Sequence, residues 1–409
     1  MPQSAQRVGL TEPVAPEVVG VPASGGDEAA ARIRDLFEAS LRAEAAQWEG
    51  GGGVPASVFS RLGGVGAFDA RWPDGARSPG RVDIAALIVR ETALASVGAG
   101  IAISTHMEAY FRALARCEYG DAAWAEAIAG RAIGAVAVTE RAGGSNPTNC
   151  ETLAERSGDG WVLHGHKQYV SNMRAATDCV VFARTARRSD LSSFTLYVVP
   201  TDAPGITATP HEQVGARASG TWMVTLDGVQ VGDDRRVGGV GSGLGLLLEF
   251  LRAERVMAAS GGLAVAELCF EIALAFAEKR QVGGARLIQQ QAIAHRLASL
   301  ATSIAAGRAL VSERLAAAQR GRISSAEAAQ LKLVLARLAW EAADEAVQIL
   351  GGRGFTEETP LAQLWRDVRI GRIGGGTDEI QLEIIAQSLR RGELSSHPAV
   401  AAVERSIEA

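Results

Sequence analysis

The sequence predicts an α+β fold in which a helical region, a β-rich region and a second helical region follow one another along 409 residues. Apolar residues recur at helical spacing before about residue 130 and after about residue 245, and their period changes to two in between. Turn residues separate these segments, and the chain is long enough for more than one packed region.

The first helical region is expected over residues 27–133. Alanine-rich segments with helical periodicity occupy residues 28–44, 84–96 and 122–129, and glycine and proline interrupt the pattern between them. Residues 1–26 are rich in Pro, Gly, Glu and Ala and have no apolar core of the kind found in signal peptides. We therefore expect them to form a disordered leader.

An antiparallel β-domain is expected over residues 134–238. Segments 180–183, 194–199 and 222–226 consist largely of β-branched, aromatic and other apolar residues, and turn residues such as those at 202–205 separate them. This is the pattern of short strands joined by tight connections.

A C-terminal four-helix bundle is expected over residues 239–395, followed by a tail at 396–409. The helical patterns at residues 246–280, 288–318 and 325–350 are longer than an average helix. Helices of this length are stable when their apolar faces pack against one another, as in a bundle.

Composition argues against several classes of function. Charged residues make up 21% of the chain and the net charge is −5, with no basic stripe of the kind that binds nucleic acid. No uncharged apolar stretch reaches 18 residues, so we expect a soluble, cytoplasmic protein without a membrane span. The four cysteines lack Cys-x-x-Cys spacing and the histidines do not cluster with them, so no metal is expected.

The most specific motif lies near the C-terminus. Residues 364–381 read Leu-Trp-Arg-Asp-Val-Arg-Ile-Gly-Arg-Ile-Gly-Gly-Gly-Thr-Asp-Glu-Ile-Gln, and residues 351–355 read Gly-Gly-Arg-Gly-Phe. Together they resemble the flavin-binding signature of acyl-CoA dehydrogenases, and the resemblance covers nearly the whole chain beyond the leader. It implies FAD as the cofactor, with Thr377 in contact with FAD and Glu379 in the helix that follows.

In that family, residues at the positions of Gln348, Gly351 and Gly352 approach the dinucleotide from a neighbouring subunit. Glycine suits such a place because it has no Cβ to block close backbone contact. The resemblance therefore implies a homodimer or homotetramer.

Residues 138–146 resemble the family segment Thr-Glu-Pro-x-Ala-Gly-Ser-Asp, although Arg141 replaces the proline. The resemblance implies that Val138, Thr139 and Ser145 contact the flavin, and that Ser145 also contacts the substrate. A strand that ends in a Gly-rich turn exposes N–H groups and hydroxyls suited to both ligands. Taken alone, the segment is more typical of a plain surface turn, because short Gly-Ser patterns are common.

Residues 165–172 resemble the second half of the same flavin site. Tyr169 is implied to stack near the isoalloxazine and Ser171 to form a hydrogen bond with it.

Residues 277–291 resemble a third family motif. The resemblance places Arg280 and Gln291 at the pyrophosphate and adenine side of FAD, although Gly283 stands where the family has phenylalanine.

The implied reaction removes the α-proton of an acyl thioester while the β-hydride passes to flavin N5. The family's usual base, a glutamate before Gly-Thr, is replaced here by Gly375. Glu254 lies on a helical face with Leu247 and Leu251, and a carboxylate on such a face is either paired or functional. The isovaleryl-CoA and long-chain branches of the family also lack the usual glutamate and place the base in this Glu-Arg pair.

Glu254 is therefore the predicted base, and a buried ion pair with an arginine is the alternative. Arg255 is expected to face the pantetheine arm of the substrate or to stabilise the fold. Gly374 and Gly375 leave space near the reacting carbons, which suits a branched or bulky acyl group.

Two other functions remain open: a flavin monooxygenase on the same fold, and a non-catalytic FAD-binding partner subunit. The thioester carrier is also open, because coenzyme A and the phosphopantetheine of an acyl or peptidyl carrier protein share the same arm. Arg184, Arg187 and Arg188 are candidates for contact with a nucleotide phosphate or an acidic carrier protein. A separate electron-transfer acceptor is expected.

Overall fold

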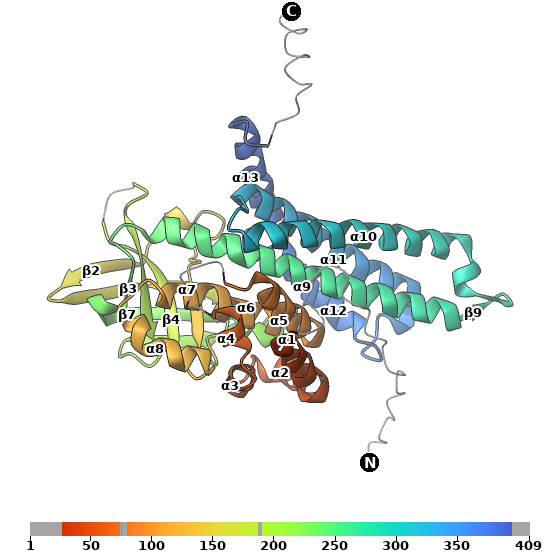
Figure 1. The fold of residues 1–409 in the computed structure, drawn as a ribbon, viewed down its shortest axis with the longest axis horizontal. Helices are drawn as coiled ribbons and strands as arrows, with labels where there is room; N and C mark the ends of the chain where they lie inside the picture. Colours follow the sequence, from red (N-terminus) through yellow and green to blue (C-terminus); the bar gives the residue numbers. More distant parts are fainter. Residues whose placement is uncertain (1–26, 74, 76–79, 187–189, 395–409) are drawn as a thin grey trace, which may run out of the picture.

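A computed structural model describes residues 27–394 of the chain, apart from 74, 76–79 and 187–189. A β-sheet forms one end of the molecule, long helices extend away from it, and shorter N-terminal helices pack alongside both (Figure 1). The predicted leader (1–26) and tail (396–409) lie outside the described residues, as do Arg187 and Arg188.

The N-terminal helical region contains more, and shorter, helices than the sequence predicts. The helix expected at 28–44 is interrupted by a π-helical turn, η1, and a second such turn, η2, follows α6. Asp27 begins α1 by accepting hydrogen bonds from the backbone N–H groups of Ala29 and Ala30. The elements are α1 (Glu28–Leu36), η1 (Phe37–Leu41), α2 (Arg42–Gly51), α3 (Ala56–Gly64), α4 (Ala67–Arg71), α5 (Val82–Ala95), α6 (Val97–Ser104), η2 (Thr105–Tyr110), α7 (Phe111–Leu114) and α8 (Tyr119–Ile128).

The β-domain is a single eight-stranded sheet with the order β6-β7-β3-β2-β4-β5-β8, and β1 pairs with β4. Most neighbours are antiparallel as expected, but β1 runs parallel to β4, so the sheet is mixed. The strands are β1 (Gly134–Ala137), β2 (Leu153–Ser157), β3 (Gly160–Val170), β4 (Asp178–Arg184), β5 (Phe194–Pro200), β6 (Ile206–Pro210), β7 (Trp222–Gly232) and β8 (Arg236–Val237).

The strand expected at 222–226 continues to Gly232 in the structure. Gly228, with φ of 69°, lies inside it, and the pairing of β7 with β3 shifts its register nearby. An irregularity of this kind bends a strand without ending it, which a simple alternation pattern does not reveal.

The C-terminal region contains the long helices that the sequence predicts. Ser324 and Glu327 form a reciprocal capping box at the start of α11. The elements are α9 (Gly243–Lys279), β9 (Gln281–Val282), β10 (Ala285–Arg286), α10 (Gln291–Gln319), α11 (Ser325–Leu350), α12 (Leu361–Asp367) and α13 (Asp378–Arg390).

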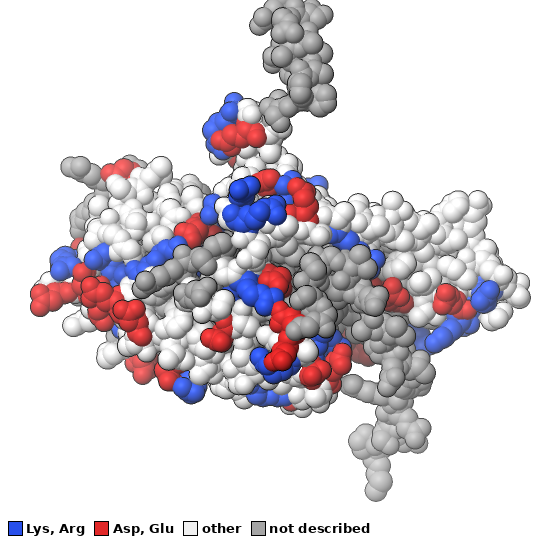
Figure 2. Space-filling view, viewed as in Figure 1, with Lys and Arg blue, Asp and Glu red and all other residues white. Residues whose placement is uncertain are grey.

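Helix α9 is the central helix of the molecule and packs against α5, α10 and α11. Among the described residues it is the one helix long and apolar enough to cross a membrane, and 56% of its most apolar window is buried inside the protein. This is the pattern of a bundle's core helix. Figure 2 shows that acidic and basic side chains are interspersed on the face in view.

Candidate functional site

Glu254 lies in the first half of α9 and is half-buried. Its carboxylate forms no hydrogen bond or ion pair with any residue that the structure describes, so the alternative of a paired glutamate has no partner here. Burial raises the pKa of Glu254, and the positive charges of Arg255 and Lys332 act in the opposite direction. A half-buried, unpaired carboxylate with a raised pKa is able to accept a proton.

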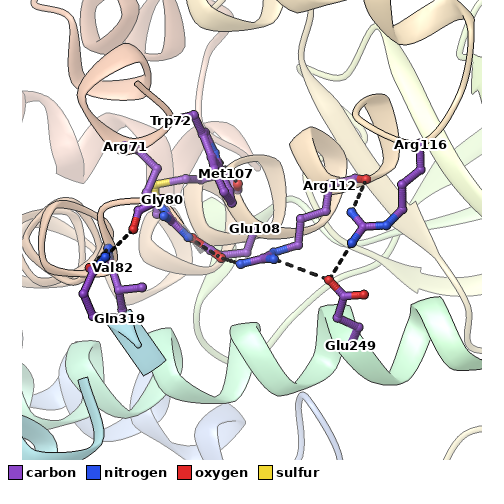
Figure 3. Close-up of polar contacts among 10 residues, drawn as sticks. All are labelled: Arg71, Trp72, Gly80, Val82, Met107, Glu108, Arg112, Arg116, Glu249 and Gln319. Atoms are coloured by element: carbon purple, nitrogen blue, oxygen red, sulfur yellow. Dashed lines mark hydrogen bonds and ion pairs between the residues drawn. The ribbon is translucent and has the colours of Figure 1, made fainter. Parts of the chain in front are cut away.

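A chain of ion pairs fixes the part of α9 that precedes Glu254 (Figure 3). Glu108 of η2 accepts two hydrogen bonds from Arg71, at 2.9 and 3.0 Å, and both side chains are 1% exposed. Arg112 connects Glu108 to Glu249 of α9, at 3.1 and 3.5 Å, and Arg116 binds Glu249 at 2.8 Å. The N-terminal helices thereby hold α9 in position little more than one turn before Glu254.

The loop that carries Gly375 is held by three buried side chains through its carbonyl oxygens. Arg255 Nε donates to Gly375 O at 3.1 Å, and Lys332 Nζ donates to Gly376 O at 2.8 Å. Gln381 Nε2 donates to both oxygens, at 3.3 and 2.8 Å. The Arg255 side chain therefore binds the loop. Of the two roles expected for Arg255, contact with the pantetheine arm or stabilisation of the fold, this contact agrees with the second.

The glycines of this loop adopt backbone conformations that other residues rarely adopt. Gly375 and Gly376 have φ of 64° and 97°. A Cβ added at Gly375 would meet no atom within 4 Å, and one at Gly374 would meet only Ile370 atoms, the nearest at 3.6 Å. The place of the usual glutamate is therefore open space, as the sequence suggested.

Thr377 begins helix α13, where its hydroxyl accepts a hydrogen bond from Ile380 N at 3.4 Å. Glu379 is exposed in the first turn of the same helix.

On the sheet, the two segments assigned to the flavin lie side by side. Gln168 N donates to Thr139 O at 2.8 Å, and Lys167 Nζ donates to Val138 O at 3.2 Å. Lys167 also forms a buried ion pair with Glu140 at 2.6 Å. Glu140 and Lys167 lie within the two segments that resemble the flavin motifs, but the sequence assigned them no role, because pairing between distant segments is not visible in a linear pattern.

Tyr169 is 61% exposed although it is large and aromatic. Its φ of 56° is unusual for a residue other than glycine, and it lies where the pairing of β3 with β7 is interrupted. The ring stacks on His211 with centroids 5.2 Å apart. Ser171 is half-buried beside it, and Ser145 is exposed on the turn that follows Glu140.

The remaining predicted cofactor residues lie at the other end of the bundle, next to the β9–β10 hairpin in Figure 1 or towards it along α11. All are exposed: Arg280, Gln291, Gln348, Gly351 and Gly352. At the rise of an α-helix, Arg280 is about 39 Å from Glu254 along the axis of α9. Gln348 is likewise about 24 Å from Lys332 along α11. The structure therefore divides the predicted cofactor residues into two separate groups.

No cluster of three or more His, Cys, Asp or Glu side chains suited to a metal occurs within the described part of the chain. The four cysteines are free, and three of them are buried. Arg184 is held by the carbonyl oxygens of Thr148 and Cys150, at 3.0 and 3.1 Å, and its guanidinium lies over the Phe194 ring.

Two models of one protein family match successive parts of the chain. The middle-domain model of acyl-CoA dehydrogenases matches residues 135–229, and the C-terminal-domain model matches residues 241–390. The chain belongs to the acyl-CoA dehydrogenase family. It is an oxidoreductase that acts on CH–CH bonds of acyl thioesters.

Particular relatives cover most of the chain. It is 30% identical to the human mitochondrial short-chain specific acyl-CoA dehydrogenase, over 88% of each chain. It is 31% identical to an acyl-[acyl-carrier-protein] dehydrogenase of Mycobacterium sp. (strain MCS), over 87% of this chain and 91% of the relative. The structure of butyryl-CoA dehydrogenase from Megasphaera elsdenii matches with a TM-score of 0.82 and 26% identity, over 88% of this chain and 97% of that one.

The predicted family and fold class are therefore confirmed, with the sheet mixed rather than wholly antiparallel.

Proposed function

We propose that this enzyme is an FAD-dependent α,β-dehydrogenase of an acyl thioester and that Glu254 removes the α-proton. The observation that carries the proposal is the position of Glu254, unpaired and next to the residue that binds the Gly375 loop. The usual base is missing from that loop, so the carboxylate that precedes the loop-binding Arg255 is the simplest replacement. The loop leaves space for the substrate, because Gly374 and Gly375 have no side chains and a Cβ at Gly375 would meet no atom within 4 Å.

The surroundings of Glu254 suit a general base for a carbon acid. Such a base must be partly desolvated, because water that solvates the carboxylate lowers its reactivity. Burial provides this, while Arg255 and Lys332 favour the charged form that accepts the proton. The two effects oppose each other, and this balance is expected where a group must be both ionised and basic.

The residues on the sheet fit a flavin. Tyr169 is 61% exposed, and its backbone conformation, with φ of 56°, costs free energy. Strained backbone conformations of this kind are concentrated at ligand-binding sites. We assign Tyr169 to isoalloxazine stacking and Ser171, Thr139, Val138 and Ser145 to hydrogen bonds with the flavin, with Thr377 at the start of α13. Bound FAD supplies the acceptor for the electron pair that leaves the β-carbon.

We further propose a homo-oligomer, a dimer or tetramer, in which each FAD is bound by two chains. Arg280 and Gln291 are too far from the sheet to reach a flavin held by Tyr169 of the same chain, given the length of α9. A second copy that presents this end of its bundle would bring a guanidinium to the pyrophosphate. Gln348, Gly351 and Gly352, which are also exposed, would belong to the same contact.

The open space at Gly374 and Gly375 favours an acyl group with a substituent or bulk near the reacting carbons. The relatives include a coenzyme A enzyme and an acyl-carrier-protein enzyme at nearly equal identity, so we propose a phosphopantetheine thioester without choosing the carrier. A separate electron-transfer protein would reoxidise the flavin.

The test is anaerobic titration of the purified yellow protein with a panel of acyl-CoAs and acyl-carrier proteins, following loss of flavin absorbance. The wild type should bleach with at least one thioester. Glu254→Gln should slow bleaching by a factor of roughly 10²–10⁴, the usual contribution of a general base. Straight and branched acyl groups in the panel report on the space at Gly374 and Gly375.

The matched control is Glu271→Gln, which removes a second carboxylate from the same helix. Glu271 is exposed, and its side chain forms no ion pair or hydrogen bond with the described residues, so this variant should keep a bleaching rate within a few-fold of wild type. If Glu254→Gln bleaches as fast as the control, Glu254 is not the base. A monooxygenase would keep its oxygen reaction in the Glu254→Gln variant, and a partner subunit would bind flavin without bleaching.

A further inference from the structure

Lys332 of α11 is buried, with 1% of its surface exposed, and it forms no ion pair with the residues that the structure describes. Its one hydrogen bond goes to a neutral group, Gly376 O, at 2.8 Å. Lysine is almost never fully buried unless its charge is paired. The charge of Lys332 therefore requires an explanation that the fold alone does not supply.

The charged groups around Lys332 come from three other segments. They are Asp378 of α13, Arg255 and Glu254 of α9, and Arg372 in the turn before the glycine loop. Asp378 attracts the ammonium most strongly, but its carboxylate is shared, because Arg337 binds it at 3.1 Å and Arg372 at 2.9 Å. Arg255 and Arg372 repel the ammonium. Glu254 is the remaining carboxylate, and it too has no ion-pair partner among these residues.

We infer that Lys332 is a positioning residue for the reaction: it holds the Gly375–Gly376 loop by a carbonyl oxygen and provides the positive charge that keeps the Glu254 carboxylate ready to accept a proton. The inference rests on the proposed role of Glu254 as the base. It explains the half-buried carboxylate of Glu254 on α9 and the buried ammonium of Lys332 on α11, neither of which has an ion-pair partner among the described residues, as charges that act on each other through space.

The two functions of Lys332 can be separated because they depend on different properties of the side chain. Holding the loop requires a hydrogen-bond donor, which Gln381 also provides to the same oxygen at 2.8 Å. Supporting Glu254 requires a charge. Lys332→Gln keeps a donor and removes the charge, whereas Lys332→Met removes both.

The charge of Lys332 is also within reach of ordinary pH. Burial lowers the pKa of Lys332 to about 8, with Asp378 and Glu254 raising it and Arg255 and Arg372 lowering it. As pH rises through this value the ammonium loses its proton, and Glu254 loses part of the attraction that favours its charged form. Removing the charge by mutation should have the same effect at every pH: a higher pKa for Glu254.

The experiment is a carbon-13 NMR pH titration of the full-length protein with its bound flavin, labelled at the glutamate carboxyl carbons. The resonance missing from Glu254→Gln is assigned to Glu254. We expect its pKa to rise by about one pH unit or more in Lys332→Gln and Lys332→Met, and to stay near the wild-type value in Lys332→Arg. If the Gln variant does not fold, the Met variant replaces it.

Arg308→Gln is the matched control for loss of a positive charge. Its partner Glu267 is about 20 Å from Glu254 along α9, beyond the distance over which charges act in salt. Glu267 keeps Arg90 as a second partner, so the helix should be undisturbed. The pKa of Glu254 should not change in this variant.

A second readout is the rate of flavin reduction by butyryl-CoA as a function of pH. In Lys332→Gln, the acid limb of this pH–rate profile should move to higher pH by the same amount as the pKa of Glu254. An unchanged pKa of Glu254 in both Lys332→Gln and Lys332→Met would overturn the inference. Failure of the proposed function would give a different result: substrate would reduce the flavin of Glu254→Gln at the wild-type rate.

Discussion

Replacing Lys167 by methionine should destabilise the protein strongly, because it leaves the Glu140 carboxylate buried without its counter-charge. Lys167 and Glu140 are 1% and 4% exposed, and their charged atoms are 2.6 Å apart. Glu140 also accepts hydrogen bonds from the backbone N–H groups of Glu151, at 2.5 Å, and Thr152, at 3.1 Å. The pair joins the two segments assigned to the flavin, so its loss should affect both folding and cofactor binding.

The magnitude follows from two independent considerations. Breaking one partner of a buried ion pair typically costs about 3–5 kcal/mol. Burial alone raises the pKa of Glu140, but Lys167 and the hydrogen bonds outweigh it and lower the pKa to about 2, against an ordinary 4.5. A difference of this size corresponds to roughly 3 kcal/mol at neutral pH. Because the backbone donors remain in Lys167→Met, we expect a loss near the lower end, about 3 kcal/mol.

The sign of the pH dependence is also defined. The folded-state pKa of Glu140 is depressed, so its stabilising contribution is present above pH 4.5 and disappears as pH falls towards about 2. In Lys167→Met, stability should depend much less on pH across that window.

The assay is thermal and urea unfolding of the wild type, Lys167→Met and the double variant Glu140→Gln/Lys167→Met. The single variant should melt roughly 6 °C lower, at about 2 °C per kcal/mol for a large domain, and should release flavin more readily. The double variant should recover most of the stability, because it contains no buried unpaired charge. The reasoning is refuted if the single variant is as stable as wild type, or if the double variant is no more stable than the single one.

Two further predictions test the site and its supports. In the Glu254→Gln background, Gly375→Glu should restore anaerobic flavin reduction at least tenfold, because open space surrounds position 375. The substitution should also cost about 1–2 kcal/mol of stability, because the backbone φ at this position is 64°. No recovery of flavin reduction would mean that a carboxylate on the loop cannot reach the substrate. Burial, followed by the charge of Glu49, raises the pKa of Asp367 to about 6. The folded protein therefore holds this proton more tightly than the unfolded chain, and stability should fall as pH rises from 3.8 to about 6. Asp367→Asn can still accept the 2.7 Å hydrogen bond from Ala216 N. In this variant, the free energy of unfolding measured in urea should no longer fall between pH 4 and pH 6.5. If it falls as much as in the wild type, groups other than Asp367 cause the pH dependence.

Much of the fold could be predicted because it follows from local patterns. The helices expected at 246–280, 288–318 and 325–350 correspond to α9, α10 and α11 within a few residues, since long stretches of helical periodicity have few alternatives. The π-helical turns and the parallel pairing of β1 with β4 were not predictable in the same way. A π-turn changes the helical spacing by one residue, and strand direction depends on where the chain re-enters the sheet.

The sequence by itself determined the family, the glycine at position 375 and Glu254 as the candidate for the missing base, because these are matters of residue identity and spacing. Only the tertiary structure decided that Arg255 binds the loop, that the charge of Lys332 on another helix acts on Glu254, and that Arg280 is at the far end of α9. The physical reason is that charges act through space at a few ångströms, whereas the positions that carry them are brought together only when the helices pack.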